Sequence, residues 1–221
     1  NSSRYLLSNL NDFNPETDLL APADMLPLDR WAVAKANEVQ TRITNAYSDM
    51  QFHLVYQEML HFCSIEMGSL FLDITKDRQY TMQADSPARR SAQSAAYLIL
   101  HALVRWMTPI LTFTAEEIWK EMPKDTTDAE LPYAQFSVWS DKLFAMNDSD
   151  LLSNEEWQAI FKVREAVSKQ LEVLRSEKLI GSSLDASVTV YASGETLQTI
   201  RKLDQELRFV LITSGATVVK A

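Results

Sequence analysis

The chain has 221 residues, 46% of them hydrophobic, with only four glycines, one cysteine and a formal net charge of −9. That length holds one large domain, or a medium and a small one, and the scarcity of glycine and proline favours helix. A single cysteine excludes an internal disulfide and suits a reducing compartment, and the sequence shows neither the roughly 20 unbroken apolar residues of a membrane span nor a signal or transit peptide.

The first fifty residues predict a short helix, a loop and a long helix. Segment 1–11 is typical of the end of a longer helix, so the sequence resembles a fragment, and the prolines of 12–27 indicate a loop. Asp24 or Asp29 is placed to cap the helix that follows. From Leu28 to Met50 apolar residues recur at mostly helical spacing, which predicts a helix.

A second long helix is predicted over residues 51–77, because its apolar residues step by three and four. Gly68 and Ser69 are expected to kink or interrupt it, since glycine weakens a helix by about 1 kcal/mol relative to alanine. Cys63 lies in this helix and is expected to be a buried structural thiol. Residues 78–85 form a connection.

The clearest helix begins at Ser86 and Pro87, with serine as the N-cap and proline in the first helical position. Its alanines line one packing face, where small side chains let neighbouring helices approach. Tyr97 and His101 are expected on the opposite side. A short helix should follow, with Thr114 as its cap.

The last part of the chain predicts a linker and a second unit. Residues 123–153 are acidic, with one extended piece at 136–139, so we expect them to link a helical-bundle domain at 1–122 to an α+β unit at 154–221. That unit looks cut off before its natural end. Its expected elements are a helix at 154–178, a strand at 186–191, a helix at 195–207 and extended segments at 209–212 and 217–219.

The sequence contains no catalytic constellation. It has no glycine-rich phosphate loop, no HExxH and no GxSxG, and its three histidines lack ligand spacing, so neither a catalytic residue nor a metal ligand is predicted. The charge is unevenly distributed. Residues 121–158 carry nine acidic side chains against two basic ones, whereas residues 74–105 carry five basic against two acidic. The net charge therefore does not exclude nucleic acid.

Four basic residues are the strongest candidates for a binding role. They are Lys76, Arg78, Arg89 and Arg90. The first two close one predicted helix and the last two open the next, so they can converge at one end of a bundle and present charge to phosphates. In the alternative interpretation the arginines pair with nearby aspartates and hold the helix ends together. Those aspartates are Asp73, Asp77 and Asp85.

Several strings of the chain resemble the anticodon-binding region of bacterial-type isoleucyl-tRNA synthetases. The strongest is Leu72-Asp-Ile-Thr-Lys-Asp-Arg-Gln-Tyr80, followed by Ala88-Arg-Arg-Ser-Ala-Gln93. Further matches are Leu28-Asp-Arg-Trp-Ala-Val33, the run from Ala102 to Trp119, and Phe209-Val-Leu-Ile-Thr-Ser-Gly-Ala216. They follow one another in collinear order over essentially the whole chain, which makes the match far more specific than one short motif.

The resemblance implies a mainly α fold, with the helix-bundle anticodon-binding domain of class I synthetases followed by a small, truncated α+β unit. It implies recognition of the anticodon stem-loop of tRNA(Ile) by a cytoplasmic protein whose full-length form ligates isoleucine to that tRNA using ATP. The catalytic and editing domains would be partners within the same chain. Their signatures do not occur here, so this fragment should be inactive alone. The fragment should hold no cofactor, whereas the full-length enzyme uses ATP and often carries a tail that binds zinc.

The same resemblance places the basic residues in a domain that grips RNA. The RNA-contact candidates are Lys76, Arg78, Arg89, Arg90, Tyr80, Tyr97 and Asn9. Tyrosines can stack on unpaired bases, and the asparagine can bond a base edge. Core packing is the preferred role of Trp31, and Arg105 with Trp106 is expected to form an interior salt bridge and a core anchor.

Two other interpretations stay open. The nearer one is the equivalent domain of valyl- or leucyl-tRNA synthetase, which shares the bundle, although the two strongest strings favour isoleucine. The other is a helical protein-interaction scaffold with no RNA role, which is consistent with the acidic balance. Binding to RNA that weakens with salt would distinguish an RNA-binding module from such a scaffold.

Overall fold

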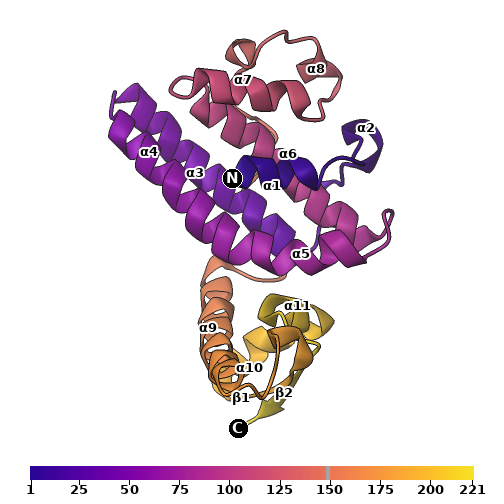
Figure 1. The fold of residues 1–221 in the computed structure, drawn as a ribbon. Coiled ribbons are helices and arrows are strands. Elements are labelled where there is room, and N and C mark those ends of the chain that lie inside the picture. Colours follow the sequence, from indigo (N-terminus) through magenta and orange to yellow (C-terminus); the bar gives the residue numbers. More distant parts are fainter. Residues whose placement is uncertain (148–149) are drawn as a thin grey trace. The chain divides into compact units, whose positions relative to one another are not determined.

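The computed structural model describes residues 1–147 and 150–221. They divide into two compact units, Asn1–Met146 and Asn147–Ala221 (Figure 1). The regular elements of the first unit are all helices, and the second combines helices with a two-stranded sheet. The predicted class, a mainly α chain with a helix bundle followed by a small α+β unit, is confirmed. Within the described ranges no helix has both the length and the apolarity needed to cross a membrane.

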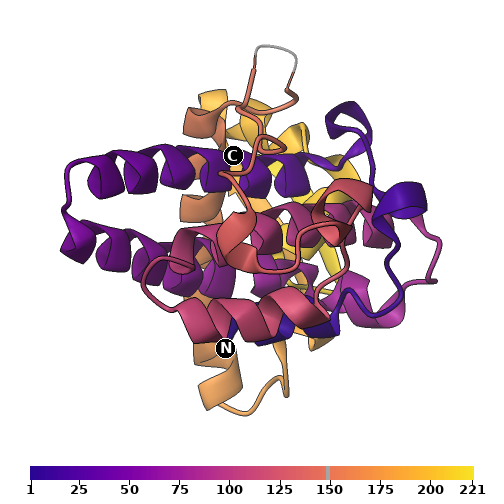
Figure 2. The same ribbon diagram turned by 90° about the horizontal axis from the view of Figure 1, so that it is seen from above.

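Helices of very different lengths build the first unit. They are α1 (Ser2–Ser8), α2 (Pro15–Asp18), η1 (Pro22–Asp24), α3 (Pro27–Ser48), α4 (Phe52–His61), η2 (Phe62–Phe71), α5 (Leu72–Thr81), α6 (Pro87–Met107), α7 (Thr112–Glu121), α8 (Thr126–Ala129) and η3 (Ala134–Phe136). The long helices α3 and α4 lie side by side (Figure 2). A tight turn joins them, in which Met50 has a φ of 54°.

The second long helix changes type along its length. α4 runs without a break into η2, a π-helix, and then into α5. Gly68 lies within η2, where an added Cβ would come within 3.1 Å of the carbonyl oxygen of Cys63. At Gly68, where a kink or interruption was expected, the helix is therefore of the π type and does not end.

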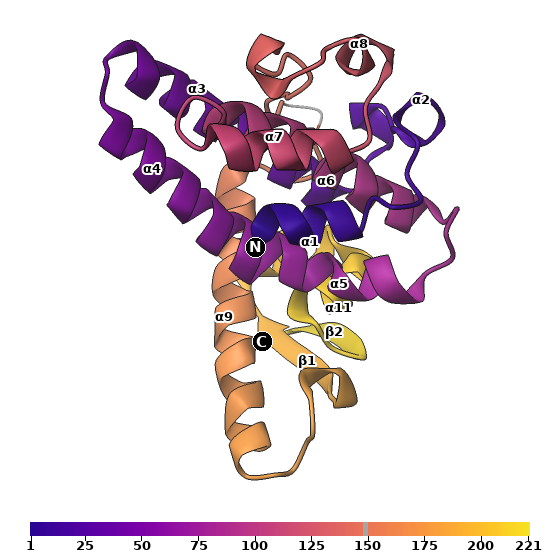
Figure 3. The same cartoon turned by 45° about the horizontal axis from the view of Figure 1, so that its top comes forward.

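The centre of the first unit is α6, in which every residue from Ser91 to Val104 is buried. Its N-cap is Ser86, as predicted, and the serine side chain accepts a hydrogen bond from the backbone N–H of Arg89 at 3.3 Å. The expectation that Tyr97 and His101 face away from the core was wrong. Helices α1, α2, α3, α5 and α7 all contact α6, so both faces are covered (Figure 3). A helix enclosed on all sides does not need an amphipathic pattern.

Residues 123–146, expected to be part of an acidic linker, fold with the first unit. Asp128 in α8 is buried against α6, and Ala134 in η3 is 1% exposed. The segment 136–139 forms no strand. Residues 148–149 also fall within the expected linker and lie outside the described residues. α7 begins at Thr112, and its N-cap, Leu111, lies three residues before the predicted cap at Thr114.

The second unit contains one long helix and a small sheet. Its elements are α9 (Asn154–Ser176), η4 (Ser183–Asp185), β1 (Ser187–Ala192), α10 (Gly194–Arg201), η5 (Asp204–Glu206), α11 (Leu207–Leu211) and β2 (Gly215–Lys220). β1 and β2 pair in parallel, with Ser187 opposite Gly215. The helix predicted at 154–178 and the strands predicted at 186–191 and 217–219 are confirmed. The extended segment predicted at 209–212 was wrong. Residues 209–211 belong to α11, which buries Val210 and Leu211, and Ile212 is its C-cap.

Candidate nucleic-acid interface

Arg78, one of the predicted RNA contacts, lies inside the first unit. Its Nη1 and Nη2 donate to the two carboxylate oxygens of Asp29, each at 3.1 Å, and both side chains are at most 1% exposed. Ser91 donates to the same carboxylate at 2.5 Å. This network joins α3, α5 and α6. Asp29 is therefore not the N-cap of α3, which begins at Pro27.

The Arg78–Asp29 pair has a structural role. Burial raises the pKa of Asp29, and the charge of Arg78 and the hydroxyl of Ser91 act against that shift. A bidentate arginine is the partner that holds such a carboxylate ionised. RNA cannot reach Arg78 without unfolding this end of the bundle, so the prediction that Arg78 contacts RNA needs correction.

Arg89 and Arg90 stand together in the first turn of α6 and face the loop that follows α1. Arg89 holds both carboxylate oxygens of Asp12, through Nη1 at 2.8 Å and Nη2 at 3.0 Å. Arg90 donates to the backbone oxygen of Asp12 at 3.2 Å and lies 3.3 Å from the carboxylate of Asp18. Gln93, one turn further along, donates to Asp12 at 2.8 Å.

Asp12 is strongly held in this cluster. Burial by itself would raise its pKa, but the hydrogen bond from Gln93 and the charge of Arg89 outweigh that effect and lower the pKa. The arginine side chains are 15% and 17% exposed and that of Asp12 is 33% exposed, so the cluster lies at the surface. Arginine–aspartate pairing was anticipated, but with Asp73, Asp77 and Asp85. The observed partners are distant in sequence.

Lys76 and Tyr80 are exposed on the last turns of α5. Tyr80 is 61% exposed, and Lys76 makes no ion pair among the described residues. Both side chains lie shortly before the connection that leads from α5 to α6. These two side chains and the surface arginines are the predicted RNA contacts that lie within reach of a ligand at this end of the bundle.

Tyr97 and Asn9 need correction as RNA contacts because both are buried. Tyr97 is fully buried and packs between the rings of Phe13 at 5.4 Å and His101 at 4.3 Å. Asn9 is 6% exposed, and its side chain donates to the backbone oxygen of Tyr5 at 2.9 Å. Tyr97 was expected on an open face of its helix, which this fold covers.

A second buried ionic cluster holds α8 against α6. Arg105 donates through Nη2 to both carboxylate oxygens of Asp128 at 2.7 and 2.9 Å, which confirms its predicted interior salt bridge. His101 lies 2.9 Å from the same carboxylate through Nδ1, and its Nε2 donates to the backbone oxygen of Pro123 at 2.9 Å. Burial lowers the pKa of His101. The predicted core positions of Trp31 and Trp106 are also confirmed.

The pH dependence of stability should report the ionisation of Asp128. Burial opposes the charge, but the contacts with His101 and Arg105 lower its pKa from 3.8 to about 2. Ionised Asp128 therefore contributes about 2 kcal/mol above pH ~4, and this contribution is lost as the pH falls towards 2. In urea unfolding, the advantage of the wild type over Asp128→Asn should shrink by about that amount between pH ~5 and ~2. An advantage that stays constant would refute this assignment.

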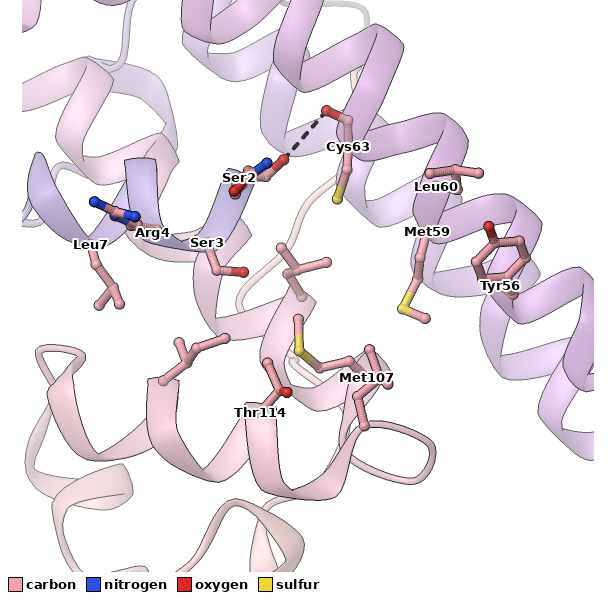
Figure 4. Close-up of a pocket in the computed structure, with 14 residues that line it drawn as sticks. Ser2, Ser3, Arg4, Leu7, Tyr56, Met59, Leu60, Cys63, Met107 and Thr114 are labelled. Carbon is pink, nitrogen blue, oxygen red and sulfur yellow. Dashed lines mark hydrogen bonds between the residues drawn. The ribbon is translucent and has the colours of Figure 1, made fainter.

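The first unit also has an apolar pocket of about 440 Å³, lined by α1, α4, η2, α6 and α7. The Cys63 thiol lies among its lining with Met59 and Met107, and Ser2 donates to the Cys63 backbone oxygen at 3.5 Å (Figure 4). Burial raises the pKa of Cys63, which disfavours the nucleophilic thiolate. Over the described ranges no group of three His, Cys, Asp or Glu side chains could hold a metal ion. The pocket therefore provides a packing surface rather than reactive groups.

The cluster on α6 includes residues that sequence analysis missed. Asp12, Asp18 and Gln93 are the partners of the arginines, and the signal available for them was weak. The aspartates belong to a segment predicted only as a loop, and Gln93 is part of a matching string without a role of its own. Their importance follows from α1 and α2 contacting α6, which no local pattern reveals.

Residues 29–190 match the protein family described as "Anticodon-binding domain of tRNA ligase". Relatives named "Isoleucine--tRNA ligase" are 52% identical in Histophilus somni, 50% in Thioalkalivibrio sulfidiphilus and 50% in Haemophilus influenzae, each over 218 residues. These alignments cover 99% of this chain and 23% of each relative. The chain thus spans about a quarter of the length of the relatives that it matches.

Proposed function

Because this chain belongs to the family of anticodon-binding domains of tRNA ligases, we propose that its helical unit binds the anticodon stem-loop of an isoleucine-accepting tRNA. One observation carries the proposal. Two guanidinium groups, those of Arg89 and Arg90, are held side by side at the surface of α6. Arginine forks match the geometry of phosphate oxygens and stay charged at any cellular pH.

The neighbouring side chains suit RNA as well. Lys76 supplies an exposed point charge, and Tyr80 offers an exposed ring on which an unpaired base could stack. The acidic total of the chain does not prevent this, because association depends on the local field, and that field is screened beyond about 10 Å at 0.1 M salt. Arg78, Tyr97 and Asn9 support the interface from inside and do not contact the ligand.

The activity of the whole protein is part of the same proposal. We infer that the longer protein ligates isoleucine to tRNA(Ile) with ATP in the cytoplasm, through catalytic and editing domains that the present 221 residues do not contain. The relatives, of which the chain spans 23%, support this inference through their name. This part alone would then be inactive as a ligase. ATP, and zinc if a zinc-binding tail is present, would bind outside it.

A titration tests the proposal directly. A fluorescent anticodon stem-loop of tRNA(Ile) should bind the chain, and binding should weaken about 10-fold between 50 and 200 mM salt. That figure assumes two or three phosphate contacts at a slope of about −0.7 to −0.9 each. A valine stem-loop of equal length is the matched control, because stronger binding to it would favour the domain of a valyl enzyme. Absence of salt-dependent binding would instead favour a protein-interaction scaffold.

A further inference from the structure

We propose that Arg89, Arg90 and Gln93 form a phosphate site on α6 that the chain's own Asp12 fills in the free protein and vacates when RNA binds. The inference rests on the proposed RNA-binding function. It adds that a carboxylate of the chain itself competes with the RNA phosphate for that site. The ligand class is a phosphodiester oxygen, which has the charge of the carboxylate and accepts the same hydrogen bonds.

The donors around Asp12 form an anion site. Arg89 contributes two N–H groups at 2.8 and 3.0 Å, and the Gln93 amide contributes a third at 2.8 Å. The guanidinium of Arg90 lies 3.9 Å from the same carboxylate. Gln93 is itself fixed, because its Oε1 accepts from Arg90 at 2.8 Å and its amide donates to the backbone oxygen of Asn9. Gln93 and Arg90 therefore hold each other in place independently of Asp12.

The site also contains a hydrogen-bond donor that Asp12 does not use. The Nε of Arg89 is buried and has no hydrogen-bond partner among the described residues. A buried N–H that stays unpaired costs free energy, so a ligand oxygen that reached it would recover part of that cost. A phosphate group offers more acceptor oxygens than a carboxylate, so it can satisfy more of these donors at once.

Asp12 can leave without unfolding its loop. The loop is anchored before and after Asp12. Leu10, two positions before it, is 3% exposed, and Phe13, directly after it, is 6% exposed against the ring of Tyr97. The carboxylate between these anchors is 33% exposed. A rotation about its side-chain torsions carries it into solvent, while the backbone keeps its contact with Arg90. The exchange is therefore a side-chain movement that an incoming phosphate can drive.

Removing the competing charge gives the test. Asp12→Asn should bind the tRNA(Ile) stem-loop about 5- to 10-fold more tightly than the wild type, which corresponds to a coupling of the usual size between two ligands of one site. The same variant should unfold at a lower temperature, because it loses an ion pair. Asp24→Asn is the matched control. It removes the same charge from the segment between α1 and α3, where Asp24 is exposed and meets no guanidinium among the described residues.

Tighter binding together with lower thermal stability is the expected signature. If Asp12→Asn binds the stem-loop no more tightly than Asp24→Asn, or more weakly than the wild type, the proposed exchange is refuted. The proposed function would not be affected by that result. If the wild type itself shows no binding to the stem-loop, the proposed function fails. Should Asp12→Asn lose helical circular dichroism, Asp18→Asn takes its place, because Asp18 pairs with Arg90 at 3.3 Å. Its affinity should rise about twofold over Asp24→Asn, and an unchanged affinity would contradict the exchange.

Discussion

Replacing Arg78 with methionine should lower the free energy of unfolding of the helical unit by about 3–5 kcal/mol. The side chains of Arg78 and Asp29 are at most 1% exposed, so the variant leaves a carboxylate buried without its counter-charge. Methionine fills much of the volume that arginine occupied. The loss therefore comes from the uncompensated charge rather than from a cavity, and urea unfolding at neutral pH measures it.

Two comparisons separate this explanation from general damage. The double variant Arg78→Met/Asp29→Asn removes both charges and keeps an acceptor for Ser91, so it should recover at least half of the lost stability. The loss in the single variant should also shrink as the pH falls, because a buried carboxyl with a raised pKa becomes neutral. A loss below about 1 kcal/mol would show that the pair contributes little to the fold.

Local patterns predicted the elements whose signals lie close together in the sequence. Ser86 followed by Pro87 marks the beginning of α6, and the alternating β-branched residues of 186–191 mark β1. Such signals depend on the backbone conformations that a few adjacent residues prefer. The run 209–212 failed as a strand because its apolar residues serve equally well in a short buried helix.

The candidate site was less predictable because its pairs join distant segments. Arg89 and Asp12 are separated by 77 positions and Arg78 and Asp29 by 49. The sequence suggested that arginines and aspartates would pair, and the expected partners were the aspartates nearest in sequence. Which pairs form depends on how α1, α2, α3 and α5 pack against α6, a property of tertiary structure. The burial of Tyr97 has the same origin.

The most direct test of whether this end of the bundle binds RNA uses the variant Arg89→Gln/Arg90→Gln. Its affinity for the tRNA(Ile) stem-loop is measured across a series of salt concentrations. Loss of two charge-assisted phosphate contacts should weaken binding by about 10- to 100-fold. The dependence of log affinity on log salt should become shallower by about 1–2. The matched control is Arg4→Gln/Arg42→Gln, which removes two arginines of the same unit that contact neither Asp12 nor Asp18.

Circular dichroism and thermal melting show whether each variant keeps its fold. The fold should survive in both, since the pairs of Arg89 and Arg90 lie at the surface and contribute about 1 kcal/mol or less each. Weakened, less salt-sensitive binding in the Arg89/Arg90 variant alone is the predicted result. An unchanged affinity and salt slope in a folded Arg89→Gln/Arg90→Gln variant would contradict the account, and so would a loss of helix caused by these two substitutions.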